Sequence, residues 1–106
     1  MQISIFYIPV GSIDTAQKIG KLAIELKLAG CANFFPIESI FPWEDAIQKE
    51  SEFVLVLKTA TYLKEKLSSF IQENHPYEIP CIMNWNVEVN QGYGEWIERN
   101  VISKSF

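Results

Sequence analysis

Three side chains of this sequence, His75, Cys31 and Cys81, are of the types that bind soft metal ions. Imidazole nitrogen and thiolate sulfur are ligands that suit copper(I) or zinc. The two cysteines lie far apart in the sequence and form no close-spaced zinc or redox motif. The residues therefore allow a soft-metal site built from His75 with one or both cysteines. The simpler interpretation is a structural or solvated histidine and two small buried thiols.

A second group of candidate residues is charged and flanks the apolar run 53–57. It comprises Glu50, Glu52 and Lys58, which in most proteins would be a solvated rim. The functional alternative is a cleft between subunits, in which Lys58 and a glutamate face Trp43 and Tyr77 and hold a small anionic or metal ligand. No nucleophile-and-base spacing, Gly-rich phosphate loop or paired-carboxylate motif is recognisable, so the sequence does not indicate an enzyme.

Apolar periodicity predicts the elements that must position these residues. Runs of β-branched and aromatic residues indicate strands, and apolar residues at helical spacing indicate helices with one buried face. The expected strands cover residues 3–8, 31–41, 46–59 and 81–89, and the expected helices lie between 12 and 30, between 61 and 76, and from 93 to 101. Residues 46–52 are polar and irregular, which predicts a twisted ribbon that extends past the body of the sheet.

Particular residues are expected to begin or end these elements. Ser12 or Asp14 can cap the first helix, and Gly30 should supply the left-handed residue that ends it. Pro9 and Gly11 should stop the first strand. Because proline cannot donate to a ladder, Pro36 predicts an edge strand or a bulge. Two sets of side chains are expected to face inward. They are Ile13, Ala16, Ile19, Gly20, Ala23 and Leu26 in the first helix, and Tyr93, Trp96, Ile97 and Val101 in the last.

The order of elements predicts an α+β, ferredoxin-like βαββαβ sandwich with a C-terminal helix. Right-handed crossovers give the sheet order 4-1-3-2. In that sheet Cys31 and Cys81 are expected to begin the two opposite edge strands at the same end, three strand spacings or roughly 14 Å apart. One metal ion cannot bridge this distance within a subunit, so a shared site would have to lie between copies.

The helices of this fold cover only one face of the sheet. The run 53–57 places large apolar side chains on both faces, which is typical of a strand that is covered on both sides. The uncovered face is therefore expected to meet another copy of the chain. A length of 106 residues with 48% apolar content fits one domain, residues 1–106, and not a disordered chain.

Charge and targeting signals exclude several classes of partner. A net charge of −4 with nine basic residues gives no electrostatic footprint for nucleic acid or an anionic membrane. The apolar start at 3–8 lacks a basic n-region and is too short to span a bilayer. The cytoplasm is the expected location.

Five motifs, taken in order, resemble the divalent-cation tolerance family CutA. They are Gly30-Cys31-Ala32-Asn33, Trp43, Glu50-x-Glu52 running into Leu57-Lys58-Thr59, His75-Pro76-Tyr77-Glu78-x-Pro80, and Tyr93-x-x-Trp96-Ile97. The resemblance implies a ferredoxin-like subunit in a stable homotrimer similar to that of PII signalling proteins. It also implies a role in tolerance of copper and other divalent metals, with copper binding. Trp96 joins Trp43, Glu50, Lys58 and Tyr77 as expected lining of the intersubunit cleft.

The sequence departs from the family pattern at two places that bear on a site. Trp43-Glu44-Asp45-Ala46 replaces the usual Trp-x-Gly-Lys turn, and Cys81 stands where the family commonly has glutamate. A site that needs the turn lysine or that glutamate would be lost.

The resulting hypothesis is a cytoplasmic, non-enzymatic homotrimer that binds copper or another divalent metal. The alternatives are a PII-like signalling protein that binds a small anionic effector at the cleft, and a structural trimeric platform for interactions.

Overall fold

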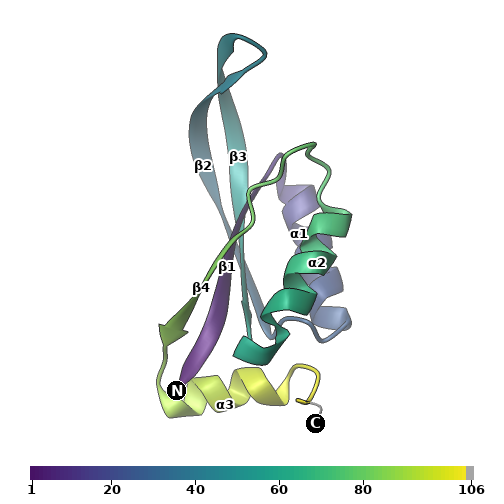
Figure 1. Ribbon diagram of the computed structural model, residues 1–106, viewed down its shortest axis with the longest axis vertical. Coiled ribbons are helices and arrows are strands. Elements are labelled where there is room, and N and C mark those ends of the chain that lie inside the picture. Colours follow the sequence, from purple (N-terminus) through teal and green to yellow (C-terminus); the bar gives the residue numbers. More distant parts are fainter. Residues whose placement is uncertain (105–106) are drawn as a thin grey trace.

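Strands and helices follow one another in the predicted order in the computed structural model, which describes residues 1–104 (Figure 1). The elements are β1 (Gln2–Val10), α1 (Ile13–Glu25), β2 (Cys31–Trp43), β3 (Ala46–Thr59), a 3-10 helix (Thr61–Leu63), α2 (Lys64–Asn74), β4 (Met83–Glu88) and α3 (Gln91–Arg99). The predicted α+β arrangement of βαββαβ followed by a helix is confirmed. Within residues 1–104 no helix is long and apolar enough to cross a membrane.

The four strands form one antiparallel sheet in the order β2-β3-β1-β4, which confirms the predicted order. The predicted placement of the two cysteines at the same end of this sheet is wrong. Three antiparallel steps separate β2 from β4, so these edge strands run in opposite directions and begin at opposite ends. Cys31 pairs with Lys58, Lys58 with Ile5, and Ile5 with Trp85, so Cys31 lies level with Trp85 in the middle of β4. Cys81, in contrast, comes before the first residue of β4.

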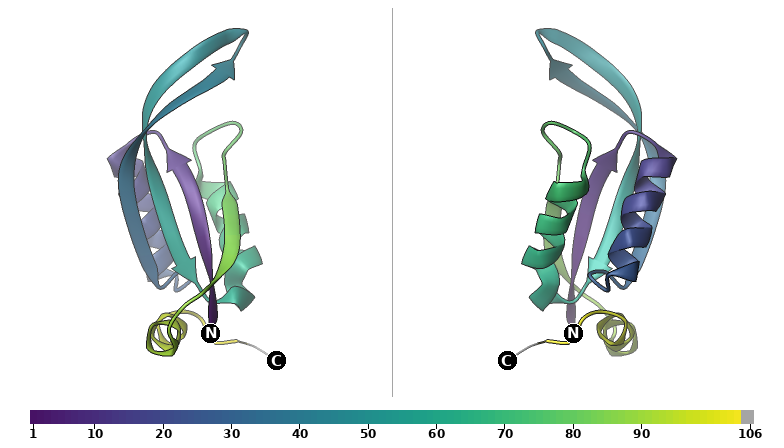
Figure 2. Two further views of the ribbon diagram at one scale, coloured as in Figure 1. Left: turned by 90° about the vertical axis from the view of Figure 1, so that its left-hand side faces the viewer. Right: turned by 90° about the vertical axis from the view of Figure 1, so that its right-hand side faces the viewer.

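Helices α1 and α2 lie side by side on one face of the sheet (Figure 2). The side chains at alternate positions of β1 and β3 point toward them, because successive residues of a strand face opposite sides. The core so formed contains Phe6, Ile8, Val10, Leu55 and Leu57 from the sheet and Ala16, Ile19, Ala23, Leu67, Phe70 and Ile71 from the helices. Each large apolar side chain buried in this way stabilises the fold by about 1.5–3 kcal/mol.

Within residues 1–104 the other face of the sheet has no helix over it, as predicted. The register places Ile5 opposite Trp85, and Tyr7 opposite both Val56 and Met83, so all five side chains share this face. Trp85 is 45% exposed and Met83 48% exposed. Large apolar side chains therefore remain open to solvent in the single chain.

The first helix ends differently from the prediction. It stops at Glu25, and Lys27, not Gly30, takes the left-handed conformation with φ of 58°. Leu26 follows the last helical residue and is 48% exposed, so it does not face the core as expected. Gly30 has another role, because a Cβ at this position would lie 3.1 Å from Cδ1 of Ile97. Its missing side chain lets α3 pack closely against the start of β2.

The ends of the strands also differ from the prediction. β1 continues through Pro9 to Val10, because β4 pairs with it only as far as Tyr7. Beyond that residue β1 has a free edge, and an edge tolerates a residue without an N–H donor. β4 begins at Met83 and not at residue 81. The predicted cap is confirmed, since the hydroxyl oxygen of Ser12 accepts a hydrogen bond from the Thr15 N–H at 3.1 Å.

Strands β2 and β3 continue beyond the sheet as a two-stranded ribbon, as predicted (Figure 1). The ladder runs unbroken to Trp43 opposite Ala46, and Pro36 lies in an edge strand. Glu44 and Asp45 form the turn with φ of 49° and 62°. Positive φ at both central residues is the signature of a type I′ hairpin turn, which usually contains Asn-Gly.

Replacing Asp45 by glycine should stabilise the hairpin. A non-glycine residue in the left-handed region destabilises the folded state by about 1–2 kcal/mol. Glycine removes this strain, but it loses more backbone entropy on folding, which costs about 0.5–1 kcal/mol. The expected net gain in the free energy of unfolding is therefore about 0.5–1 kcal/mol, measured by urea denaturation. In the control Ala46→Gly the glycine falls in the strand, where it should destabilise. Equal effects of both changes would contradict the turn assignment.

Candidate functional site

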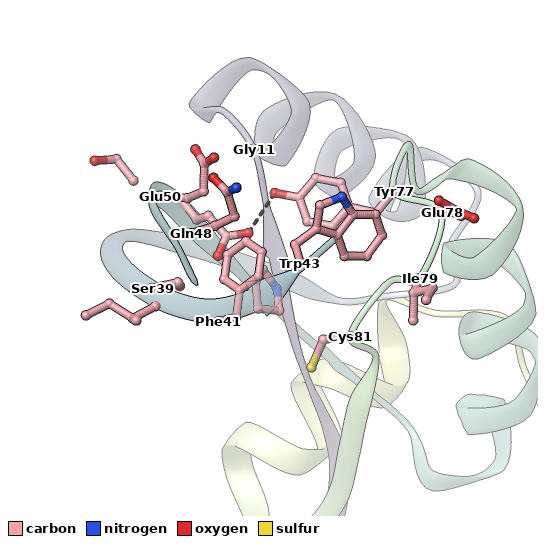
Figure 3. A pocket seen from close by; sticks show the side chains of 14 residues that line it. Gly11, Ser39, Phe41, Trp43, Gln48, Glu50, Tyr77, Glu78, Ile79 and Cys81 are labelled. Atoms are coloured by element: carbon pink, nitrogen blue, oxygen red, sulfur yellow. Dashed lines mark hydrogen bonds between the residues drawn. The ribbon is translucent and has the colours of Figure 1, made fainter. Parts of the chain in front are cut away.

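The ribbon, from Glu52 to Trp43 beside its turn, and the loop between α2 and β4 border a cavity of about 880 Å³ (Figure 3). Trp43 and Glu50 reach it from the two strands of the ribbon, and Tyr77 and Cys81 reach it from the loop. Three of the five predicted cleft residues thus line one cavity within a single chain. The polar ribbon curls back over the loop, and this brings residues that are distant in sequence to one place.

A short hydrogen bond ties the loop to the ribbon at this cavity. The Tyr77 hydroxyl donates to Oε2 of Glu52 at 2.6 Å, and the Glu52 side chain is only 7% exposed. Burial raises the pKa of Tyr77, and the hydrogen bond to Glu52 and the charges of Glu52 and Glu50 raise it further. The phenol therefore keeps its proton and remains a donor to the carboxylate.

His75 holds Tyr77 in place. Its Nε2 lies 2.8 Å from the carbonyl oxygen of Pro9, and because a carbonyl can only accept, this nitrogen carries the proton and donates. Its Nδ1 accepts a hydrogen bond from the Tyr77 N–H at 3.1 Å. The two rings lie 4.6 Å apart at a tilt of 58°. Both nitrogens of this buried imidazole are thus used in positioning the loop.

The three residues predicted as metal ligands are not brought together within one chain. Cys81 borders the cavity, His75 is engaged by Pro9 and Tyr77, and Cys31 lies at the start of β2, whereas the cavity is lined by the other end of that strand. Among residues 1–104 no group of three or more His, Cys, Asp or Glu side chains could hold a metal ion. The donor set of a single chain does not fit a metal centre, and a site shared between copies stays a prediction.

The other two predicted cleft residues belong to a second cluster, at the start of β2. Lys58 pairs with Cys31, and its Nζ lies 5.6 Å from the centre of the Tyr93 ring, within the range of a cation–π contact. Trp96 stacks on Tyr93 at 5.9 Å and is 43% exposed, so the prediction that it faces inward is wrong. The neighbouring Ile97 fills the core position of α3.

Burial and two neighbouring groups change the pKa of Tyr93 in this second cluster. Burial raises the pKa of Tyr93, the Cys31 thiol raises it further, and the Lys58 ammonium opposes both effects. Lys58 lies six residues from Glu52 along β3, roughly 20 Å at the rise of a strand. Lys58 and Trp96 therefore do not face Trp43 and Tyr77 within one chain.

Sequence reasoning missed the contact that organises the cavity. The period of two along a strand places Glu50 and Glu52 on one face, which the sequence could have shown. The partner of Glu52 is Tyr77, 25 residues away in a loop, and no local pattern predicts that contact. Phe41, Glu78 and Ile79 also line the cavity and were not among the predicted site residues.

The fold, with its long ribbon and helix across the end of the sheet, places the chain among ferredoxin-like α+β proteins. The solved structure of CutA1 from Pyrococcus horikoshii matches with a TM-score of 0.91 and 30% identity, covering 94% of this chain and 99% of that one. A structure described as periplasmic divalent cation tolerance protein CutA, from Archaeoglobus fulgidus, matches with a TM-score of 0.88 and 33% identity, with the same coverage of 94% and 99%.

Sequence comparison identifies the family. The divalent-cation tolerance protein CutA of Archaeoglobus fulgidus is 34% identical over 96 residues, which cover 90% of this chain and 94% of that relative. Residues 4–100 match the family described as CutA1 divalent ion tolerance protein. The chain belongs to this family, and the resemblance found in its motifs is confirmed.

The bond between Tyr77 and Glu52 should give the stability a measurable pH dependence. The pKa of Tyr77 is higher in the folded chain than its ordinary value of 10.0, so the unfolded chain loses this proton first as the pH rises. The free energy of unfolding should therefore fall above about pH 10. Tyr77→Phe should show a shallower fall, together with a loss of about 1–3 kcal/mol at neutral pH. Urea denaturation across this range measures both effects.

Glu52→Gln is the matched control, because an amide still accepts the hydroxyl but carries no charge. Its slope above about pH 10 should lie between those of the wild type and Tyr77→Phe. A Tyr77→Phe variant with the wild-type slope would show that this phenol does not contribute.

Proposed function

We propose that this protein acts in tolerance of divalent cations by binding copper or another divalent metal as a homotrimer, without catalysing a reaction. Membership of the CutA1 divalent ion tolerance family carries the proposal. The relatives from Archaeoglobus fulgidus and Thermus thermophilus are named for divalent-cation tolerance and not for a reaction. The proposal places the protein in the cytoplasm, where the free thiols of Cys31 and Cys81 would stay reduced. A relative described as periplasmic makes cell fractionation the necessary check.

The uncovered face of the sheet supports the homotrimer. Phe35, Met83 and Trp85 are between 43% and 48% exposed on it. Burying about 600 Å² of such surface per subunit corresponds to about 15 kcal/mol at 25 cal/mol per Å², before the costs of association. In the described part of the chain no strand pairs with the outer edges of β2 and β4. Closed symmetry would cover these surfaces in every copy, and three-fold symmetry corresponds to the PII-like arrangement.

The positions of the two cysteines support a metal site that is shared between copies. Cys31 begins the edge strand β2 and Cys81 lies just before β4, the opposite edge strand, so one ion could contact both thiols only if they came from different chains. Thiolates suit copper(I) and zinc. His75 could bind the same ion through Nδ1 only if this nitrogen first released the Tyr77 N–H. We therefore expect the two thiols to contribute more to the metal affinity than His75.

Light scattering at low micromolar concentration should report a trimer. Three chains of 12.2 kDa each give a mass of 36.6 kDa. Val56 lies on the uncovered face, and Val56→Glu should reduce the mass to that of the monomer, because it would bury an unpaired charge. The control Leu22→Glu changes an exposed residue of α1 and should leave the trimer intact. A soluble wild-type monomer would refute the proposed assembly.

Titration with buffered copper(I) should locate the metal site. Cys31→Ser and Cys81→Ser should each weaken copper(I) binding by at least about tenfold. Loss of a residue that only supports a metal ligand already costs about tenfold or more, and loss of a ligand should cost at least as much. His75→Ala should cost less, because its nitrogens are engaged within the fold. Equal affinity of the wild type and both cysteine variants would exclude these thiols as ligands.

A further inference from the structure

Helix α3 has few buried side chains of its own with which to hold its place. It lies across the end of the sheet (Figure 1), and of its nine residues Gly94 and Ile97 are buried. Asn90 at its start forms no side-chain capping hydrogen bond with any residue in the range 1–104. Helices shorter than about 12–15 residues are marginal in water without tertiary support. The stability of α3 must therefore depend on further contacts next to it.

The segment that follows α3, residues 100–104, supplies an apolar contact of this kind. Val101 is 5% exposed and forms a small cluster with Ala60 and Leu63, separate from the core between the sheet and the helices. Ala60 follows the end of β3, and Leu63 belongs to the 3-10 helix. Val101 thus anchors the C-terminal end of α3, as Ile97 anchors its middle.

Two hydrogen bonds fix the next residue of this segment, Ile102. Its N–H donates to the Lys27 carbonyl at 2.9 Å, and its carbonyl accepts the Tyr62 hydroxyl at 2.8 Å. Three parts of the chain that are far apart in sequence therefore meet at Ile102. They are the turn after α1, the 3-10 helix and the segment after α3.

A Schellman motif at the end of α1 provides one acceptor for this segment. The Leu28 N–H donates to the Ala23 carbonyl at 2.9 Å, and the Lys27 N–H donates to the Ile24 carbonyl at 3.0 Å. In this motif the residue with positive φ ends the helix, which is Lys27 with φ of 58°. The carbonyl of this same residue accepts the Ile102 N–H. The left-handed turn thus places the acceptor at the strand end that α3 crosses.

We propose that residues 100–104 form a strap that holds α3 against the end of the sheet, and that release of this strap lets α3 open as a separate unit. Local opening is expected where few buried apolar contacts hold an element. Opening would part Tyr93 from Lys58 and Ile97 from Gly30. It would thereby uncover the start of β2 and leave the ribbon and the helix layer folded.

The strap does not depend on assembly or on metal binding. Its partners Lys27, Tyr62, Ala60 and Leu63 belong to the same chain. None of them lies on the uncovered face, the ribbon or the outer strand edges, which are the surfaces proposed to meet other copies.

Hydrogen–deuterium exchange of the full chain, followed by mass spectrometry, tests the strap. Tyr62→Phe keeps the ring but removes the hydroxyl that donates to Ile102. It should speed exchange of the α3 amides about fivefold, because one hydrogen bond contributes about 1 kcal/mol and 1.4 kcal/mol is tenfold. Val101→Ala removes two buried carbon atoms and should speed this exchange about tenfold or more. Exchange in α1 and α2 should stay as in the wild type.

Tyr77→Phe is the matched control, because it removes a tyrosine hydroxyl that donates elsewhere, to Glu52. It should speed exchange in the loop between α2 and β4 and leave that of α3 unchanged. If circular dichroism shows that Val101→Ala is unfolded, Tyr62→Phe decides the test.

Wild-type exchange of the α3 amides in the folded strap variants would overturn the proposed strap. An equal rise in α1, α2 and α3 would show that α3 opens only with the whole chain, and would overturn the separate unit. The measurement uses neither copper nor the mass of the assembly, so its failure is distinct from a failure of the proposed function.

Discussion

The pairing of β2 with β3 is the constraint on which the rest of the structure depends. One unbroken ladder, from Cys31 opposite Lys58 to Trp43 opposite Ala46, builds both the edge of the sheet and the projecting ribbon. Its register turns Leu55 and Leu57 toward the helices and leaves Glu50 and Glu52 together on the opposite face. A slip of one residue would exchange these faces, so the core that α1 and α2 cover also fixes the position of the cavity.

A chain of hydrogen bonds connects the cavity with the centre of the sheet. It runs from the Pro9 carbonyl of β1 through His75 to Tyr77, and from the Tyr77 hydroxyl to Glu52 at the base of the ribbon. The only histidine of the sequence is therefore a positioning residue in the single chain. Networks of this kind rigidify a structure when every member is satisfied. The loop between α2 and β4 is held in this way against the ribbon.

Periodicity and the crossover rule predict the elements, their order and the strand order, because each depends on short-range patterns and on chirality. The prediction that both edge strands begin at the same end of the sheet was wrong, because their relative direction depends on the number of strand reversals across the sheet. Gly30 does not have a positive φ and donates its N–H to the Lys58 carbonyl at 2.8 Å, and the left-handed residue comes earlier, at Lys27. For the candidate site, Trp43, Glu50 and Tyr77 could be predicted from their types and motifs. The separation of Lys58 and Trp96 from these residues could not be predicted. It depends on the distance along β3 and on which side of α3 faces the sheet.

The exposed ribbon is also a possible site of aggregation, and residues within the ribbon itself reduce this risk. Ile40 and Ile47 are 70% and 81% exposed on its strands, and a bare two-stranded ribbon is a template on which foreign strands can add. Pro36 and Pro42 remove N–H donors from β2, and the turn carries the like charges of Glu44 and Asp45. Two such tips repel one another, and an interrupted row of donors pairs poorly with a new strand. These four residues therefore protect an uncovered ribbon against aggregation, without a further layer of structure over it.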